Sequence, residues 1–404
     1  MGSRGIDTAT LAIAAGGTGG HLFPGLSVAR AWLLRHPGGS VVFFGTKKDA
    51  RYVEGQDPRL RFVAVSMQGV AGRGVRGIAG LFVKGVPSIL AMIRELLKGR
   101  PCAAVCFGGF VSFPVGVAAW VLRIPLFIHE ANAIPGMVNR LLRRWAKKMF
   151  VAHAGMLASW GTRALLVGIP VRDGIEDAKS FKEDFNFKKS GLNSRPVRIL
   201  VIGGSQGAYS MNRIVLESLE QLFLRLDAEV ILQWGKWPTG GVESYLERFK
   251  GRLLVLPFIE DMALTYRWAD VIVSRSGAST LAELAFVEKP AILVPFPFAT
   301  HNHQLLNAQA AERAGAAVVL EEKHLNADNF VEALVALAQD PACWEHMGLA
   351  WKSLAHPKAA DRMIETIEAY MKGVHLNVPA KPYAVFSGDR RNRDERDCRA
   401  SVEP

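Results

Sequence analysis

Two stretches of the sequence repeat one pattern, and this repeat limits the folds that the chain can adopt. Leu11–Ala15 is a short apolar run followed by Gly16-Gly17-Thr18-Gly19-Gly20, and Arg198–Ile202 is followed by Gly203-Gly204-Ser205-Gln206-Gly207. Each stretch is typical of a strand that leads into a glycine-rich turn and then a helix, as at the start of a nucleotide-binding α/β half. The sequence therefore predicts two such halves.

Apolar runs alternate with longer helical patterns along the rest of the chain, which favours parallel sheets covered by helices. A chain of 404 residues is also too long for one core, because cores stop growing at about 250–300 residues. The predicted fold class is α/β, with two Rossmann-like parallel-sheet domains that face each other across a cleft. Further strands are expected at Val41–Phe44, Ala103–Phe107, Pro125–His129, Glu229–Gln233, Leu253–Leu256, Val271–Ser274 and Ala291–Val294.

The net charge of +12 is distributed unevenly. Residues 1–171 contain 21 basic and 6 acidic residues, whereas residues 172–373 contain 22 basic and 26 acidic residues. A basic half favours binding of nucleic acid, phosphorylated small molecules or an anionic membrane surface. With 50% hydrophobic and 21% charged residues, the composition excludes a disordered chain.

The segment Cys102–Leu122 carries no charge and is long enough to suggest a membrane span. Its internal glycines and Pro114 instead favour a buried strand, a glycine turn and a helix that begins near Pro114. The run Leu11–Ala15 is too short for the core of a signal peptide. Because the four cysteines show no Cys-x-x-Cys spacing, we expect buried, reduced thiols in a cytosolic protein.

The glycine-rich turns suit phosphate, because backbone N–H groups and the start of a helix attract anions. Neither turn is a dinucleotide fingerprint or a P-loop, and close strand–helix packing would also explain a single turn. His21 follows the first turn at the expected mouth of the cleft. Its imidazole suits a general base near neutral pH, although a hydrogen-bonded structural histidine is the alternative.

The run Ser274–Glu283 again leaves a strand and enters a helix. Thr280 and Glu283 have the spacing of a capping box, but Glu283 could equally accept hydrogen bonds from the vicinal hydroxyls of a ribose. Farther along, His301-x-His303 lacks the nearby Cys, Asp or Glu that would complete a metal site. The chain also has no Asp-x-Asp pattern for a divalent cation.

Taken together, these motifs resemble those of the MurG family, from about Leu11 to Gly373. MurG enzymes transfer N-acetylglucosamine (GlcNAc) from UDP-GlcNAc to undecaprenyl-diphospho-muramoyl-pentapeptide. The motifs that carry the resemblance are Gly16-Gly17-Thr18-Gly19-Gly20-His21-x-x-Pro24-Gly25, Gly108-Gly109-Phe110-Val111-Ser112, His129-Glu130-x-Asn132-Ala133-x-Pro135-Gly136, Gly203-Gly204-Ser205-Gln206-Gly207-Ala208 and Ser274-Arg275-Ser276-Gly277-Ala278.

The resemblance implies the GT-B fold and a set of residues that bind UDP-GlcNAc, with no cofactor and no metal. Glu283 would hold the ribose, the Ser205 loop the diphosphate, and Gln304 the GlcNAc hydroxyls. The full set is Thr18, Gly19, Gly20, Asn132, Arg172, Ser205, Ile259, Ala278, Ser279, Thr280, Leu281, Ala282, Glu283 and Gln304.

The resemblance also implies a domain plan. Residues 8–171 would form a membrane-facing acceptor domain, to which a C-terminal helix at 356–373 returns, and residues 172–355 would bind UDP-GlcNAc. Residues 374–404 lose periodicity and are expected to be a disordered tail. Three positions depart from the family pattern, since Phe110, Ala131 and Ile169 stand where Tyr, Gln and Asn are usual.

The implied reaction is an inverting displacement at the anomeric carbon of GlcNAc by the C4 hydroxyl of the muramoyl sugar. It converts lipid I to lipid II through a β-1,4 link and serves peptidoglycan synthesis, cell shape and cell division. His21 is our first candidate for the general base and Glu130 the second. The implied partners are UDP-GlcNAc, the lipid-linked acceptor, an anionic membrane surface and other cell-wall synthesis proteins, without nucleic acid. The implied location is the cytoplasmic face of the inner membrane, as a peripheral protein.

Basic and apolar residues of the first half are expected to form a membrane-docking patch. The alternative is that the apolar members belong to the core and the cations form a solvated rim. The basic members are Arg73, Arg76, Lys84, Arg94, Arg140, Arg143, Arg144, Lys147 and Lys148, and the apolar members are Leu81, Phe82, Val83, Ile89, Leu90 and Trp145.

Three other functions fit the sequence less well. A nucleotide-dependent oxidoreductase needs a Gly-x-Gly-x-x-Gly motif in its first strand–helix turn, where Leu22 replaces the third glycine here. A UDP-sugar 2-epimerase or glycolipid transferase would share the donor site, but the His129-Glu130-x-Asn132 segment argues against it. A nucleic-acid binder would use the basic half, yet no aromatic-rich surface or groove-binding helix motif is evident.

Overall fold

The computed structural model describes residues 6–66, 74–177, 195–204, 207–299 and 302–374, and it describes no side chains within 67–84. The predicted tail at 374–404 thus lies outside these ranges beyond residue 374, as do Ser205 and His301. The described residues divide into a first unit, 6–172 with 356–374, and a second unit, 173–355. No helix within the described ranges is long and apolar enough to cross a membrane.

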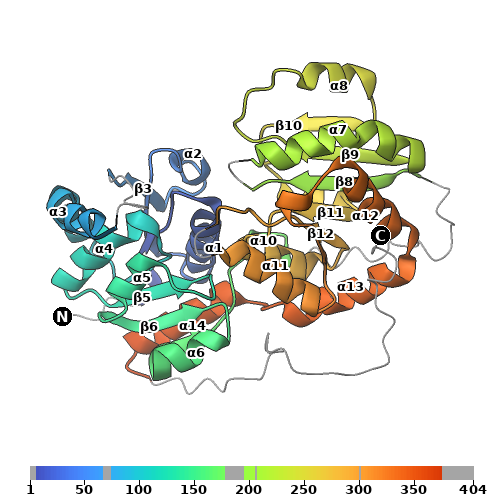
Figure 1. Cartoon of the computed structure of the whole chain (residues 1–404). Helices are drawn as coiled ribbons and strands as arrows, with labels where there is room; N and C mark the ends of the chain where they lie inside the picture. The colour runs from blue at the N-terminus through green and yellow to red at the C-terminus, as the bar shows by residue number, and fades with distance from the viewer. Residues whose placement is uncertain (1–5, 67–73, 178–194, 205–206, 300–301, 375–404) are drawn as a thin grey trace. The chain divides into compact units, whose positions relative to one another are not determined.

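The first unit is built on a parallel sheet with the strand order β3-β2-β1-β4-β5-β6-β7 (Figure 1). Its strands β1, β4 and β5 lie at the centre and contain almost only buried residues, as expected for a sheet covered on both faces. The strands are β1 (Thr10–Ala14), β2 (Ser40–Gly45), β3 (Leu60–Ala64), β4 (Ala103–Cys106), β5 (Leu126–Glu130), β6 (Ala146–Val151) and β7 (Ala164–Leu166).

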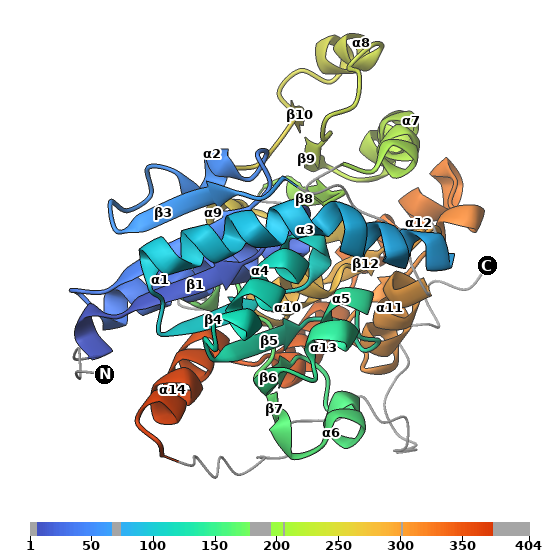
Figure 2. The same cartoon turned by 90° about the vertical axis from the view of Figure 1, so that its left-hand side faces the viewer.

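Helices cover both faces of this sheet because successive strand residues point to opposite sides. Leu11 and Ile13 pack with α1 (Gly19–Arg35), α2 (Ala50–Val53) and α14 (Ala359–Met371). Ala12 and Ala14 pack with the helices of the other face, which Figure 2 shows in front of the sheet. These are α3 (Gly74–Gly99), α4 (Gly109–Val121), α5 (Met137–Leu142) and α6 (Gly155–Trp160).

Helix α14 comes from the far end of the described chain, yet it packs within the first unit. In Figure 1 it is the red helix among blue and green elements. Met363, Ile364 and Ile367 are fully buried in the cluster that contains Trp32 of α1. Arg35 of α1 also donates to Glu368 of α14, with Nε to Oε1 at 2.6 Å.

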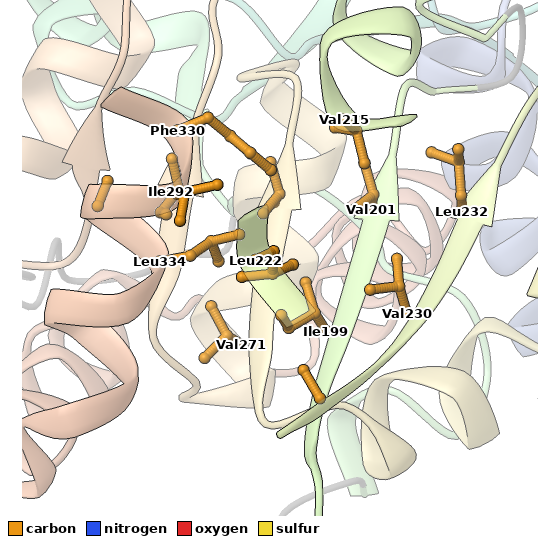
Figure 3. Packing of buried hydrophobic residues seen from close by; sticks show 14 of the residues in the cluster. Ile199, Val201, Val215, Leu222, Val230, Leu232, Val271, Ile292, Phe330 and Leu334 are labelled. Atoms are coloured by element: carbon orange, nitrogen blue, oxygen red, sulfur yellow. The ribbon is translucent and has the colours of Figure 1, made fainter. Parts of the chain in front are cut away.

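The second unit has a parallel sheet in the order β10-β9-β8-β11-β12-β13. One face packs against α7, α12 and α13, and Figure 3 shows Leu222 of α7 between Ile199 of β8 and Leu334 of α12. The strands are β8 (Val197–Ile202), β9 (Ala228–Gln233), β10 (Leu253–Leu256), β11 (Val271–Ser274), β12 (Ala291–Leu293) and β13 (Val318–Val319). The helices are α7 (Tyr209–Arg225), α8 (Val242–Arg248), α9 (Met262–Trp268), α10 (Ala278–Val287), α11 (His303–Arg313), α12 (Ala327–Gln339) and α13 (Pro341–Leu354).

The strand order reverses at an equivalent place in each sheet. The first strand of each unit, β1 or β8, has the second strand on one side and the fourth on the other. Open α/β sheets bind ligands at the carboxyl ends of the strands next to such a reversal. Both glycine-rich turns, which follow β1 and β8, therefore lie at the expected binding edges.

The predicted α/β class with two parallel sheets is confirmed, and one detail needs correction. Helix α4 begins at Gly109 and not near Pro114, which lies inside it. The paired glycines suggested a longer turn. Both have positive φ angles, but Gly109 already begins the helix. Proline at this position removes one backbone donor without ending the helix.

The described cysteines agree with the expectation of reduced thiols. Cys106 and Cys343 are buried, Cys102 is half-buried, and none of the three forms a disulfide. Burial raises the pKa of the Cys106 thiol to about 12. Cys398 lies outside the described residues.

Candidate functional site

In the first unit, a buried carboxylate holds the glycine turn after β1. Asp49 is 6% exposed, and its Oδ2 accepts hydrogen bonds from Gly17 N at 3.0 Å and from Thr46 N at 2.7 Å. The Thr46 hydroxyl donates to the same oxygen at 2.6 Å. A Cβ on Gly16 would lie 2.4 Å from this oxygen, so only glycine permits the approach.

This turn leads into α1 and places the predicted residues Thr18, Gly19, Gly20 and His21 at its start. Thr18 Oγ1 lies 3.2 Å from His21 Nδ1, and the half-buried ring packs beside Gly108 and Gly109. Burial lowers the pKa of His21 below the usual 6.5, and the negative charge of Glu130 partly opposes this shift. His21 is therefore neutral at pH 7 and able to accept a proton.

Glu130, the second candidate base, ends β5 and is only 3% exposed. Its Oε1 accepts from Asn132 N at 3.0 Å and from Asn132 Nδ2 at 3.2 Å. Its Oε2 accepts from Gly136 N and from Asn139 Nδ2, both at 2.9 Å. Four donors organise the loop between β5 and α5 around this carboxylate.

Other residues surround this edge of the first sheet. His129 Nε2 lies 2.9 Å from Gly168 O, and burial lowers the pKa of His129 to about 4. The guanidinium of Arg172 lies 4.2 Å above the ring of Phe23 in α1. Phe110, which departs from the family pattern, packs against the glycine turn, since a Cβ on Gly17 would lie 3.1 Å from its ring.

In the second unit, the turn after β8 also depends on close backbone contacts. A Cβ on Gly207 would lie 2.4 Å from Trp234 O, in the segment that follows β9. Gly207 N donates to Gly204 O at 2.9 Å, and α7 begins two residues later. The predicted diphosphate residue Ser205 lies outside the described residues.

The predicted run Ala278, Ser279, Thr280, Leu281, Ala282 and Glu283 forms the first half of α10. The capping-box interpretation of Thr280 and Glu283 is wrong, because the N-cap is Gly277 and Thr280 already lies inside the helix. Glu283 is 4% exposed, and its Oε2 accepts from the hydroxyl of Tyr266 at 2.9 Å. A buried tyrosine in α9 therefore orients this carboxylate.

Gln304 lies at the start of α11 and is joined to the same edge of the second sheet. Its Oε1 accepts from Phe296 N at 3.0 Å, and its backbone oxygen accepts from Ser276 Oγ at 2.7 Å. Asn307 Nδ2 donates to Ser276 O at 3.1 Å. Ile259, another predicted residue, is buried in the segment between β10 and α9.

An ion pair that the sequence did not reveal joins three segments of the second unit. Arg275, 6% exposed, pairs with Glu322, which also accepts from Ser210 of α7. Arg275 Nη1 donates to Val294 O at 3.1 Å. These contacts of Arg275 hold the turn after β11 in place.

In the part of the chain that the structure describes, no three His, Cys, Asp or Glu side chains gather in a group that could hold a metal ion. His303 lies at the start of α11, and His301 is outside the described residues.

Each unit thus gathers its own predicted residues at the carboxyl edge of its sheet. Thr18, His21, Glu130 and Asn132 meet in the first unit, and the α10 residues with Gln304 do so in the second. Sequence reasoning missed Asp49, Asn139, Tyr266 and the Arg275–Glu322 pair. The contacts of Asp49 and Tyr266 depend on tertiary structure, and no local sequence motif predicts them.

Two family models match successive parts of the chain. The glycosyltransferase family 28 N-terminal domain matches residues 11–151, and the glycosyltransferase family 28 C-terminal domain matches residues 198–363.

Curated relatives match over most of their length. A UDP-N-acetylglucosamine–N-acetylmuramyl-(pentapeptide) pyrophosphoryl-undecaprenol N-acetylglucosamine transferase from Anaeromyxobacter sp. (strain Fw109-5) is 37% identical over 87% of this chain and 91% of its own. The protein of the same name from Acidithiobacillus ferrooxidans is 38% identical over 88% of this chain and 95% of its own.

Solved structures agree with these matches. The crystal structure of MurG from Acinetobacter baumannii has a TM-score of 0.66 and 28% identity, covering 89% of this chain and 98% of that one. A UDP-GlcNAc 2-epimerase from Neisseria meningitidis, bound to UDP-GlcNAc, has a TM-score of 0.60 with 14% identity, covering 89% of this chain and 99% of that one. The second likeness concerns the fold alone, and together these neighbours identify the GT-B fold.

Proposed function

The chain belongs to the MurG family within glycosyltransferase family 28, and on this premise we propose that it transfers GlcNAc from UDP-GlcNAc to the C4 hydroxyl of the lipid-linked muramoyl pentapeptide. The product is the β-1,4-linked disaccharide of the peptidoglycan precursor. The observation that carries this proposal is the identity of 37–38% to relatives named for that transfer, over 87–88% of the chain and across both units.

The geometry of the first unit supports a role in proton transfer. The C4 hydroxyl of the acceptor attacks the anomeric carbon as the bond from that carbon to UDP breaks, and the hydroxyl proton passes to the neutral imidazole of His21. Thr18 and the glycines beside the ring orient His21. Glu130 stabilises the imidazolium that forms, because its negative charge acts on His21.

The geometry of the second unit supports a role in holding the donor. The glycine turn after β8 and the start of α10 offer backbone amides and helix dipoles to the diphosphate, whose charge grows as UDP departs. Glu283, oriented by Tyr266, accepts from the ribose hydroxyls. Gln304 contacts GlcNAc, and Ile259 is a further donor residue of this unit. Asn132 and Arg172 of the first unit remain predicted donor residues.

We also propose that the first unit docks on an anionic membrane at the inner, cytoplasmic leaflet. Trp120, 49% exposed, stacks on Trp145 at 4.6 Å, and the guanidinium of Arg144 lies 4.4 Å above the Trp145 ring. Leu90 is 60% exposed, so this predicted apolar residue is available at the surface. Tryptophan and arginine beside exposed aliphatic residues are typical of membrane interfaces.

The predicted docking patch is only partly described by the structure. Ile89 and Trp145 pack partly against the core, as the alternative interpretation required. The basic residues Arg94, Arg140, Arg143, Arg144 and Lys147 are exposed, and Lys148 is half-buried. The side chains of Arg73, Arg76, Leu81, Phe82, Val83 and Lys84 lie outside the described residues.

The transfer itself is tested by incubating the purified protein with UDP-GlcNAc and the lipid-linked muramoyl pentapeptide. We expect UDP release and a product heavier by one GlcNAc in the mass spectrum. Substrate without the muramoyl acceptor is the control. Absence of acceptor-dependent UDP release would reject the proposed function.

Membrane docking is tested by co-sedimentation with vesicles. Replacing Arg144 and Lys147 by Gln should weaken binding to anionic vesicles by about 30-fold, since each cation near the surface contributes roughly 1 kcal/mol. The matched control replaces Arg213 and Arg248 of the second unit by Gln, which changes the net charge equally. Binding that ignores salt, anionic lipid and both pairs of substitutions would contradict electrostatic docking.

A further inference from the structure

Asp49 uses its side chain in an unusual way for its position. It precedes α2 as the N-cap residue, where an aspartate ordinarily accepts from the first backbone N–H groups of its own helix. Here no side-chain cap forms on α2. The carboxylate instead points to the turn after β1 and accepts all three of its hydrogen bonds described above on one oxygen.

The contacts of Asp49 hold the first part of the turn, beside the packing of Phe110 on Gly17. Gly16 permits this contact because the Cβ of any other residue there would collide with Oδ2 of Asp49. Gly17 adopts a φ of +85°. The Gly17 N–H, which would otherwise be free to turn, is held by a charged acceptor. Hydrogen bonds to an ionised carboxylate are stronger than those between neutral groups.

The fixed turn carries the candidate base. Thr18 follows Gly17 directly, and its hydroxyl contacts His21, whose ring rests on Gly108 and Gly109. Asp49 is thus connected to His21 through Gly17 and Thr18 of the turn.

We propose that Asp49 is a positioning residue for the transfer, holding the Gly16–Gly20 turn so that His21 is oriented as the base. The inference rests on the proposed function and adds a residue that none of the motifs contains. The alternative is a purely structural tie between the segments after β1 and β2. The two differ in whether the loss of Asp49 changes the chemical behaviour of His21.

The test compares Asp49→Ala and Asp49→Asn in the full-length protein with Asp57→Asn as a matched control. Asp57 belongs to the same unit, and its carboxylate pairs with Arg59 away from the turn. Asparagine keeps an oxygen acceptor for Gly17, so it should rescue part of the loss. Thermal unfolding followed by circular dichroism identifies the variants that fold. If Asp49→Ala does not fold, Asp49→Asn is used for the comparison in its place.

We expect kcat to fall by up to about 100-fold in Asp49→Ala, the effect of misplacing a reacting group by about 1 Å. Asp49→Asn should lie between this variant and the wild type, and Asp57→Asn should match the wild type. If Asp49 only stabilises the fold, the correctly folded molecules of each variant should instead have the kcat of the wild type.

A second readout does not depend on activity. The titration of His21 is followed by NMR in histidine-labelled protein and assigned with His21→Ala. The charged and titratable groups that face His21 are Glu130 and His129 of β5. Loosening the turn admits water, so the His21 midpoint should rise toward 6.5 in Asp49→Ala and stay unchanged in Asp57→Asn.

The outcomes separate the two proposals. An unchanged His21 midpoint in Asp49→Ala, with an unchanged kcat, would overturn the positioning role while leaving the transfer intact. A near-normal kcat in His21→Ala would show that His21 is not the base. Absence of UDP release by the wild type would remove the proposed function, even if the NMR titration responded to Asp49.

Discussion

The first and second units share a glycine-rich turn at the reversal of a parallel sheet, but they stabilise their binding edges differently. In the first unit, two buried carboxylates, Asp49 and Glu130, gather backbone and side-chain donors around a histidine. In the second, backbone contacts at Gly207 and the links of Ser276 to α11 hold the edge.

This difference corresponds to two kinds of chemistry. A titratable cluster suits the transfer of a proton, because small changes in its surroundings alter protonation. Turns and helix starts with fixed backbone amides suit a phosphate ligand, since they supply positive potential without a titrating group. One architectural plan therefore suits two kinds of task.

The largest expected effect comes from removing the base of the first unit. His21→Ala should lower kcat by about 10²–10⁴, the usual contribution of a general base, with a smaller change in KM for UDP-GlcNAc. Steady-state UDP release measures both constants. His324→Ala, an exposed histidine of the second unit, is the control. A near-normal kcat would contradict the assignment of proton transfer to the first unit.

The next effect should appear in donor binding by the second unit. Glu283→Gln should raise KM for UDP-GlcNAc on the order of 10- to 100-fold, because a hydrogen bond to a charged group contributes about 1.5–3 kcal/mol. Tyr266→Phe keeps the carboxylate and removes only its orienting hydroxyl, so its increase in KM should be smaller. Equal KM values in all three proteins, with lower thermal stability in the variants, would assign Glu283 a structural role only.

The smallest effect concerns the pH dependence of the first unit. The pKa of His21 is lowered by burial and raised by Glu130, so kcat/KM should fall on the acidic side below pH 6.5, where His21 becomes protonated. Glu130→Gln removes the opposing charge and should move this acidic limb to lower pH, by about one unit. A limb that stays in place or moves to higher pH would show that Glu130 does not act on the base.

Much of the fold could be predicted because buried parallel strands are continuous apolar runs. The central strands β1, β4, β8 and β11 were each located to within about one residue. The missed strands lack that signature. Two lysines interrupt β6, β3 is half-exposed, and β7 and β13 are short.

The candidate site was predictable only where local motifs mark it. The turn before His21 and the segment around Glu130 stand out as residue patterns, and the structure brings their side chains together. Asp49 lies 32 residues from Gly17, and Tyr266 lies 17 residues from Glu283. These partners meet because the order of the strands places separate segments of the chain side by side. That order cannot be derived from a single sequence.

The return of α14 to the first unit has a consequence for the order of events during synthesis. The ribosome makes most of the first unit early, but the residues Met363, Ile364 and Ile367 that close its core on α1 emerge after the whole second unit. Until then the cluster around Trp32 lacks the apolar partners that α14 supplies. The unit that is translated first is therefore completed last, and a chain stalled at residue 355 would carry a finished second unit beside an unfinished first one.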